Sequence, residues 1–294
     1  MILSTPLYNV DRLQEAQGAA LEILTAIDAL CRKYGIFYLL DSGTLLGAVR
    51  HQGFIPWDDD ADIAMTRENY DRFVTVAAEL PEEFELVKPE IFAAEDKFYD
   101  FTPRVIYKNS KMRLWSEEQD YYGGKLNHLW VDIFILDNIP DGKLADQKTR
   151  LAQKILYGYA MAKRYALDMT KYQGAAKAEV KFLTRKGKKI PMQEILKKQE
   201  ALSRKWNGEK TARLYYSNYQ PDYLHCTVNR EWSEAVTELP FEGHRFYCPA
   251  NYDAVLTEIY GDYMTLPPEE KRMPTHSDDI EIFKDGKPAP IVYR

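Results

Sequence analysis

Five carboxylates in one short stretch are the residues of this sequence that are best placed to do chemistry. They are Asp41, Asp58, Asp59, Asp60 and Asp62. The apolar residues after them predict a strand that carries Asp60 and Asp62, and side chains two positions apart on a strand point to the same side. Because like charges held together repel each other, this pair predicts a divalent cation, and carboxylate oxygens suit Mg²⁺ or Mn²⁺. The roles of Asp58 and Asp59 stay open.

A Ser-Gly turn comes before these carboxylates. An apolar strand is expected over 37–41, and a helical segment over 44–50 follows Gly43 directly. The first N–H groups of a helix have no partner within the helix, and this end attracts anions. Ser42, Gly43 and Thr44 are therefore predicted to bind a substrate phosphate beside the metal. The alternative is a capped turn followed by a solvated acidic loop, because short motifs often occur by accident.

Two other kinds of site can be compared with this stretch. Asp58, Asp60 and Asp62 have the spacing that begins an EF-hand calcium loop. That loop also needs glycine at its sixth position and Glu at its twelfth, where this chain has Ile63 and Asn69. The sequence contains no Walker A motif either.

Another candidate carboxylate lies in the apolar run 127–137. On a strand, Trp130, Asp132 and Phe134 would share one face. A carboxylate among large apolar side chains is costly unless it is paired, hydrogen-bonded or metal-bound. Asp132 is therefore a candidate for the same site, and the alternative is a structural carboxylate that holds a backbone N–H group. Asp137 is expected in the turn that follows the strand.

Three blocks of the chain resemble the LicD family of phosphocholine transferases, which is related to the fukutins. The longest match runs from Leu40 to Ile63 and contains GTLLGAVRHQGFIPWDDDADI; the others are WVDIFILD at 130–137 and NYDAVLTEIYGDYMTLPP at 251–268. The resemblance implies a nucleotidyltransferase-like fold, in which Asp132 on a neighbouring strand is the third carboxylate of the metal site. The segment between about 140 and 235 has no such resemblance.

The resemblance also implies the reaction. The chain is expected to transfer a phosphoalcohol group, with phosphocholine as the first choice, from a CDP-alcohol such as CDP-choline to a sugar hydroxyl, releasing CMP. The sugar would belong to a cell-surface glycan or its precursor, such as teichoic acid or lipopolysaccharide. Asp60, Asp62 and Asp132 would be the catalytic residues and the ligands of Mg²⁺ or Mn²⁺. The alternatives are a CDP-ribitol or CDP-glycerol phosphotransferase, a true nucleotidyltransferase that releases diphosphate, and an inactive binding protein.

Several basic side chains are candidates for binding the substrate diphosphate. Arg50 and His51 lie in the longest block, and Arg makes planar contacts with phosphate oxygens. Their alternative role is to complement the C-terminus of a helix. Arg104, on a predicted strand, is a further substrate-binding candidate. Arg272 and His276 follow the last block and are further candidates for contact with phosphate, and for His276 a surface position is the preferred interpretation.

The alternation of helical and strand patterns predicts an α+β protein. We expect a nucleotidyltransferase-like core, a mixed β-sheet flanked by helices, formed by about 11–140 and 236–276, with a helical basic insertion over about 143–210. The 294 residues would then form a single catalytic unit. The first helix is expected to begin with a capping box at Asp11 and Gln14 and to end at Gly35.

The predicted insertion carries a local excess of positive charge. Residues 171–210 include 10 Lys and 2 Arg against 4 Glu, whereas the whole chain has a formal net charge of −6. This segment could face an anionic, lipid-linked acceptor, and the alternative is a solvated helical surface. The negative charge of the whole chain argues against a nucleic-acid binder.

Composition and hydropathy suit a water-soluble enzyme with a sizeable core, since 45% of the residues are hydrophobic and 29% are charged. The three cysteines are far apart and predict neither disulfides nor a zinc cluster. The sequence shows no signal peptide, and no apolar run approaches the ~18 residues of a transmembrane helix. A cytoplasmic location is expected, with peripheral contact at the inner face of the membrane if the acceptor is lipid-linked.

Choline recognition usually needs an aromatic cage. The chain has 21 Tyr and 5 Trp, and Trp115, Tyr121 and Tyr122 are close together in the sequence. Because aromatic side chains more often belong to a core, no site is assigned to these three residues.

Overall fold

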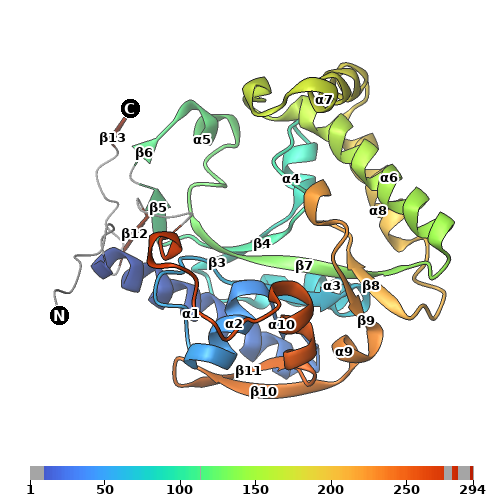
Figure 1. Cartoon of the computed structure of the whole chain (residues 1–294). Helices are drawn as coiled ribbons and strands as arrows, with labels where there is room; N and C mark the ends of the chain where they lie inside the picture. The colour runs from blue at the N-terminus through green and yellow to red at the C-terminus, as the bar shows by residue number, and fades with distance from the viewer. Residues whose placement is uncertain (1–9, 113, 275–279, 284–291, 294) are drawn as a thin grey trace.

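The computed structural model describes residues 10–112, 114–274, 280–283 and 292–293. Within them, helices flank a mixed β-sheet, which confirms the expected α+β class (Figure 1). The strands of the sheet are β1 (Leu39–Leu40), β2 (Asp62–Thr66), β3 (Phe84–Val87), β4 (Arg104–Tyr107), β7 (Leu129–Ile139), β8 (Arg213–Tyr216) and β9 (Thr227–Asn229). Their order is β1-β2-β7-β4-β3, with β8 paired to β7 and β9 paired to β8.

Strand β7 organises this sheet. Its 11 residues include the buried Val131, Ile133 and Ile135, and such β-branched side chains favour a strand. Its first half lies between β2, which is parallel to it, and β4, which is antiparallel. Its last residues pair with β8 in the antiparallel direction. One long strand therefore connects the two halves of the sheet.

The helices and the short strand pairs surround the sheet. The helices are α1 (Val10–Tyr34), α2 (Ser42–His51), α3 (Arg67–Val76), α4 (Pro89–Ala93), α5 (Glu117–Tyr121), α6 (Lys143–Ala160), α7 (Gly174–Gly187), α8 (Met192–Arg204), α9 (Arg230–Glu234) and α10 (Tyr252–Tyr260). The additional strand pairs are β10 (Val236–Phe241) with β11 (His244–Pro249), β5 (Ser110–Met112) with β12 (Ile280–Ile282), and β6 (Leu114–Trp115) with β13 (Val292–Tyr293).

Helix α1 buries one apolar stripe against the sheet. Ala20, Ile23, Leu24 and Ile27 recur at helical spacing and are at most 1% exposed. The expected helix is confirmed, but its capping box is wrong because α1 already includes Val10. Asp11 therefore lies in the first turn, where its charge complements the helix N-terminus.

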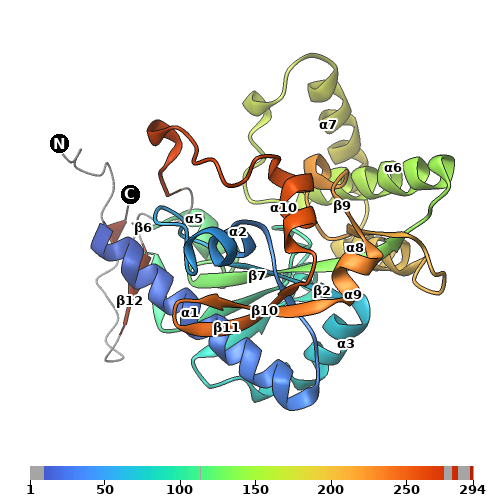
Figure 2. The ribbon, with the colours of Figure 1, turned by 60° about the horizontal axis from the view of Figure 1, so that its bottom comes forward.

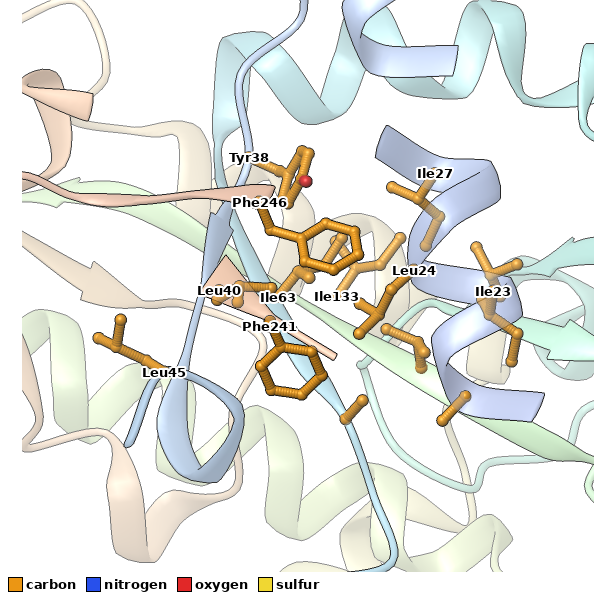
Figure 3. Packing of buried hydrophobic residues seen from close by; sticks show 14 of the residues in the cluster. Ile23, Leu24, Ile27, Tyr38, Leu40, Leu45, Ile63, Ile133, Phe241 and Phe246 are labelled. Carbon is orange, nitrogen blue, oxygen red and sulfur yellow. The ribbon is translucent and has the colours of Figure 1, made fainter. Parts of the chain in front are cut away.

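The main core joins the two ends of the chain. Ile23, Leu24 and Ile27 of α1 meet Ile63 of β2, Ile133 of β7, and Phe241 and Phe246 of the β10–β11 hairpin (Figure 3). The hairpin turns at Glu242 and Gly243. These residues have φ of 48° and 77°, and two consecutive positive φ angles are typical of a type I′ turn. The hairpin packs against α2 through β10 (Figure 2) and against β1 through β11.

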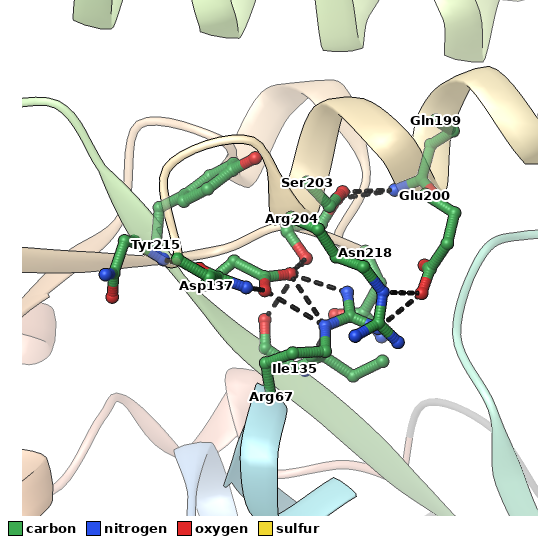
Figure 4. A network of polar contacts seen from close by, with 12 residues as sticks. Arg67, Ile135, Asp137, Gln199, Glu200, Ser203, Arg204, Tyr215 and Asn218 are labelled. Carbon is green, nitrogen blue, oxygen red and sulfur yellow. Dashed lines mark hydrogen bonds and ion pairs between the residues drawn. The ribbon is translucent and has the colours of Figure 1, made fainter. Parts of the chain in front are cut away.

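A buried polar network connects α3, β7, β8 and α8. Arg67 Nη2 lies 2.6 Å from Asp137 Oδ2, and the two side chains are 8% and 0% exposed (Figure 4). Asn207 and Ser217 also donate to Asp137, and Glu200 accepts from Arg67. The prediction that Asp137 lies in a turn is wrong, because β7 continues to Ile139.

Helices α6, α7 and α8 stand together beside the sheet, within the range 143–210 (Figure 1). They share a separate apolar cluster that includes Tyr157, Met161, Met192 and Ile195. The division of the chain into a core and an insertion stays a prediction. Within the described ranges, no helix is both long enough and apolar enough to cross a membrane.

Candidate active site

The N-terminus of α2 opens onto a cleft of about 740 Å³. Ser42 and Gly43 both line it. Ser42 has φ of 48°, a left-handed conformation that costs energy in a residue other than glycine and that often occurs at functional sites. A Cβ atom on Gly43 would lie 2.6 Å from Asp58 Oδ2. Only glycine at this position lets the Asp58 carboxylate lie so close to the start of the helix.

Three carboxylates line the same cleft: Asp58, Asp60 and Asp62. Strand β2 begins at Asp62, so the prediction that Asp60 lies on this strand is wrong. Asp60 belongs to the segment that leads into it and still shares the cleft with Asp62. Asp59 does not line the cleft and is 3% exposed.

Asp132 lies beside Asp62 in the sheet. The two residues are partners in register on the parallel strands β2 and β7, and Arg104 is the partner of Asp132 on β4. Arg104 Nε is 3.1 Å from Asp132 Oδ1. Because partners in register point to the same face, the sheet presents Asp62, Asp132 and Arg104 in one row across three strands.

The environment of these carboxylates disfavours their negative charge. Burial, followed by repulsion from Asp60 and Asp132, raises the pKa of Asp62 well above its ordinary value. Burial raises the pKa of Asp132 to about 6 although Arg104 opposes the change. Burial likewise raises the pKa of Asp41 to about 6. Positive charge brought into this part of the cleft would stabilise all three carboxylates.

Thr44 holds the strand that carries Asp62. Its side chain is buried, and its Oγ1 accepts a hydrogen bond of 2.9 Å from the backbone N–H of Asp62. The backbone N–H of Asp41 donates to the Asp62 carbonyl oxygen at 3.1 Å. Thr44 does not line the cleft. Its observed hydrogen bond helps to fix the position of the Asp62 carboxylate. Its predicted contact with substrate stays a prediction.

Arg50 and Arg272 form a positive end of the cleft. Arg50 lines it and donates to the Tyr263 carbonyl oxygen and to His51 Nε2. The guanidinium of Arg272 lies over the Trp57 ring, 5.5 Å from its centroid. Burial and the nearby charge of Arg272 lower the pKa of Arg50. His51 accepts from Arg50, and its pKa is lowered by burial and by that same neighbour, which favours the neutral ring.

Arg104 is buried behind the carboxylates. It is 2% exposed, donates to Asp100 at 2.7 Å and lies between the rings of Tyr99 and Trp130. These contacts suit a cation that offsets the charge of Asp132. Arg104 does not line the cleft, and its predicted contact with substrate phosphate stays a prediction.

The sequence analysis missed the tyrosines of the cleft. We call Tyr216, Tyr219, Tyr223 and Tyr260 the tyrosine wall, because all four line the cleft beside the carboxylates. Three of them lie within eight residues, a density that could have pointed to a site. Tyr121 and Tyr122 instead pack near Tyr165 and Phe92, away from this cleft. His276 and the side chain of Trp115 lie outside the described residues.

The carboxylates fit a hard divalent cation. Within the described residues, Asp132 Oδ1 and Asp41 Oδ2 are buried and have no hydrogen-bond partner. No three of the described His, Cys, Asp and Glu side chains already surround a common point as metal ligands would. Mg²⁺ often binds through one or two carboxylates and completes its shell with substrate phosphates and water. The donor set therefore fits Mg²⁺ that arrives together with a phosphate substrate.

This combination defines a class of enzyme. A mixed sheet presents carboxylates to a cleft, a helix N-terminus and Arg50 line the same space, and Arg272 lies over Trp57 at its border. Negative groups suited to a metal and positive groups suited to phosphate are the means by which phosphoryl transfer is catalysed.

Comparisons with known proteins name the family. Residues 35–136 match the family described as LicD/FKTN/FKRP, nucleotidyltransferase domain. Over 283 residues the chain is 30% identical to the lipopolysaccharide cholinephosphotransferase LicD of Haemophilus influenzae, covering 92% of this chain and 98% of that protein. An uncharacterized protein of Rickettsia typhi is 46% identical over 59 residues, which is 20% of this chain and 19% of that protein. The chain therefore belongs to the LicD family and is a transferase of the LicD type.

Proposed function

We propose that this enzyme transfers phosphocholine from CDP-choline to a sugar hydroxyl of a cell-surface glycan or its precursor, and that CMP leaves. The observation that carries the proposal is the alignment of Asp62 with Asp132 across β2 and β7, at a place where Asp62 lines the cleft that opens at the N-terminus of α2. The relative from Haemophilus influenzae is named as a lipopolysaccharide cholinephosphotransferase, which supports phosphocholine and a lipopolysaccharide-type acceptor.

Asp60 and Asp62 would hold Mg²⁺ in this reaction. When bound, the ion would neutralise charge on the diphosphate as the phosphorus-oxygen bond breaks. The raised pKa of Asp62 supports this assignment, because a cation would relieve the repulsion that raises it. Mn²⁺ has similar preferences for oxygen ligands.

The remaining groups of the cleft bind and orient the donor. Ser42 and Gly43 offer backbone N–H groups at the N-terminus of α2 to a phosphate. Arg50 and Arg272 supply positive charge for the phosphate that leaves with CMP. The acceptor oxygen forms a bond to the phosphorus that bears choline, and the bond between this phosphorus and the oxygen of CMP breaks.

Asp132 has two roles open to it. It can complete the metal site, or it can take the proton of the acceptor hydroxyl, for which a pKa of about 6 is suitable. The variant Asp132→Asn separates the two. Weaker Mg²⁺ binding by calorimetry assigns it to the metal, whereas unchanged Mg²⁺ binding with lost turnover assigns it to the proton.

The acceptor and the location remain part of the proposal. A lipid-linked glycan precursor would bring this enzyme from the cytoplasm to the inner face of the membrane. The basic segment 171–210 suits such an anionic acceptor, since it includes the exposed Lys177 and Lys181 of α7.

The test measures CMP release from CDP-choline with Mg²⁺ and a lipopolysaccharide acceptor. Asp60→Asn and Asp62→Asn should each lower kcat by at least about 1,000-fold while the proteins stay folded, because each removes a charge from the predicted metal site. EDTA should stop the wild-type enzyme, and added Mg²⁺ should restore it. Asp71→Asn is the control, since Asp71 forms an exposed ion pair with Arg204.

Near wild-type turnover by either cleft variant would refute the assignment of the carboxylates. The released product separates the rival reactions. A true nucleotidyltransferase would release diphosphate, and a CDP-ribitol or CDP-glycerol enzyme would release CMP only from its own donor. A binding protein would bind nucleotide and release neither product.

A further inference from the structure

Tyr219 and Tyr223 of the tyrosine wall form a stack, or column, of rings with Phe134. The rings of Phe134 and Tyr219 are parallel within 9° and 4.5 Å apart, and those of Tyr219 and Tyr223 are 4.6 Å apart. Tyr216 meets the edges of this column, with its ring 5.9 Å from Phe134 and 6.1 Å from Tyr219. Tyr223 ends the column and is 47% exposed. A well-packed column thus presents an aromatic face to the cleft.

Tyr260 belongs to the same wall although it comes from α10. It lies near enough to Tyr216 and Tyr219 to contribute to the raised pKa of each phenol. Its side chain is 43% exposed and lines the cleft. Aromatic faces from two distant parts of the chain therefore meet at one end of the cleft.

This end of the cleft is negative. After burial, the charges of Asp41 and Asp62 are the largest causes of the raised pKa of Tyr260, and the same two residues act on Tyr219. Asp41 is 4% exposed, and its Oδ1 accepts from the Tyr216 hydroxyl at 3.0 Å. Ring faces carry negative charge as well, so carboxylates behind aromatic rings favour a cation in front of them.

Positive charge lies at the end of α10, where Arg50 donates to the Tyr263 carbonyl oxygen and lies near enough to Tyr260 for this phenol to act on the pKa of Arg50. Arg50 and Arg272 make no ion pair with a carboxylate within the described parts of the chain. Trp57 lies beneath Arg272 at this end. These two arginines therefore leave positive charge available to a phosphate of the donor.

We propose that Tyr223 and Tyr260, with Tyr219 stacked behind Tyr223, form a subsite for the quaternary ammonium group of the donor, and that this subsite selects choline over uncharged alcohols. The inference rests on the proposed function, because that function supplies the cation. A trimethylammonium group cannot donate a hydrogen bond, so it needs dispersion and cation-π contacts, which ring faces provide. The two carbons of choline keep the ammonium close to the transferred phosphate, as the adjacency of the wall and the carboxylates requires.

The experiment measures, by calorimetry with Mg²⁺, the dissociation constants of CDP-choline, CDP-glycerol and CMP. Tyr223→Leu and Tyr260→Leu keep apolar bulk and remove a ring, and each should weaken CDP-choline about 10-fold. Binding of CMP and CDP-glycerol should stay within about twofold. The matched variants Tyr223→Phe and Tyr260→Phe keep the ring and should bind CDP-choline as the wild type does.

The control Tyr165→Leu changes an aromatic side chain that is 37% exposed and outside the cleft, and it should change none of these constants. Equal weakening of CDP-choline and CMP would overturn the subsite, because the rings would then stack on cytosine. Unchanged CDP-choline binding in both leucine variants would also overturn it. Turnover decides the proposed function separately: a wild-type enzyme that binds CDP-choline through the tyrosines but releases no CMP would refute that function and keep the subsite.

Discussion

Replacement of Gly43 by alanine tests whether the Asp58 carboxylate must lie against the start of α2. The added Cβ atom would lie 2.6 Å from Asp58 Oδ2, whereas ordinary contact begins at 3.4 Å. The carboxylate must therefore move by about 0.8 Å, the difference between these two distances. Asp58 ends in a flexible side chain, so the backbone does not have to move.

The expected effect is on catalysis rather than on stability. Alanine is favoured over glycine within a helix by about 0.5 to 1 kcal/mol, which offsets the cost of moving one carboxylate. The free energy of unfolding should stay within about 1 kcal/mol of the wild type. Because a displacement near 1 Å in an active site can cost about 100-fold, kcat/KM for CDP-choline should fall by about that factor.

The assay combines CMP release with urea unfolding. Gly18→Ala is the matched control, since this residue lies in α1 with nothing within 4 Å of an added Cβ atom. It should keep full activity and gain slightly in stability. If the loss acts through Asp58, the double variant Gly43→Ala with Asp58→Gly should be no slower than Asp58→Gly alone. Full activity of Gly43→Ala would refute the reasoning, and so would an equal loss in Gly18→Ala.

Two further predictions concern stability and can be checked by urea unfolding. Because burial raises the pKa of Asp41 from 3.8 to about 6, the folded chain keeps a proton that the unfolded chain has released between these values. Its contribution to the free energy of unfolding is therefore fully present below pH 3.8 and is lost, by about 3 kcal/mol, as the pH rises from 3.8 through 6, and Asp41→Asn should remove this part of the slope. A slope that is unchanged in Asp41→Asn would show that other groups cause it. Arg67→Met should lower the free energy of unfolding by about 3 to 5 kcal/mol, because it leaves Asp137 charged and buried. Arg204→Met removes exposed ion pairs, and the loss of each pair should lower the free energy of unfolding by less than about 1 kcal/mol. Equal losses in the two arginine variants would contradict the importance of burial.

The elements that carry local patterns could be predicted from the sequence. The spacing of apolar residues in α1, the alternation in β7 and the Glu-Gly turn of the hairpin each depend on residues close together in the chain. The residues at which strands begin and end were harder to predict. Asp60 seemed to belong to β2 because it alternates with Asp62, but sheet pairing with β7 begins only at Asp62. Asp137 seemed to lie in a turn because Pro140 follows, but pairing with β8 extends β7 past it.

In the candidate site, too, some parts could be predicted from the sequence and others could not. The acidic stretch and the α2 turn are contiguous in the sequence, so their proximity could be predicted. The tyrosine wall combines a segment after β8 with a helix 37 residues later, and only tertiary packing brings Tyr223 and Tyr260 to one cleft. Thr44 was predicted to bind substrate phosphate, and the structure shows a different contact, in which its side chain accepts a hydrogen bond from the Asp62 backbone N–H. The local sequence does not distinguish a buried side chain that holds the backbone from a side chain that faces the cleft.

The β10–β11 hairpin is synthesised long after α1, although both belong to the main core. Phe241 and Phe246 complete the core to which α1 belongs, so this part of the core stays open to water until the hairpin has been synthesised. At 5 to 20 residues per second, the hairpin follows roughly 10 to 40 s later. A chain that stops before residue 236 lacks both phenylalanines, and this part of its core has nothing to pack against.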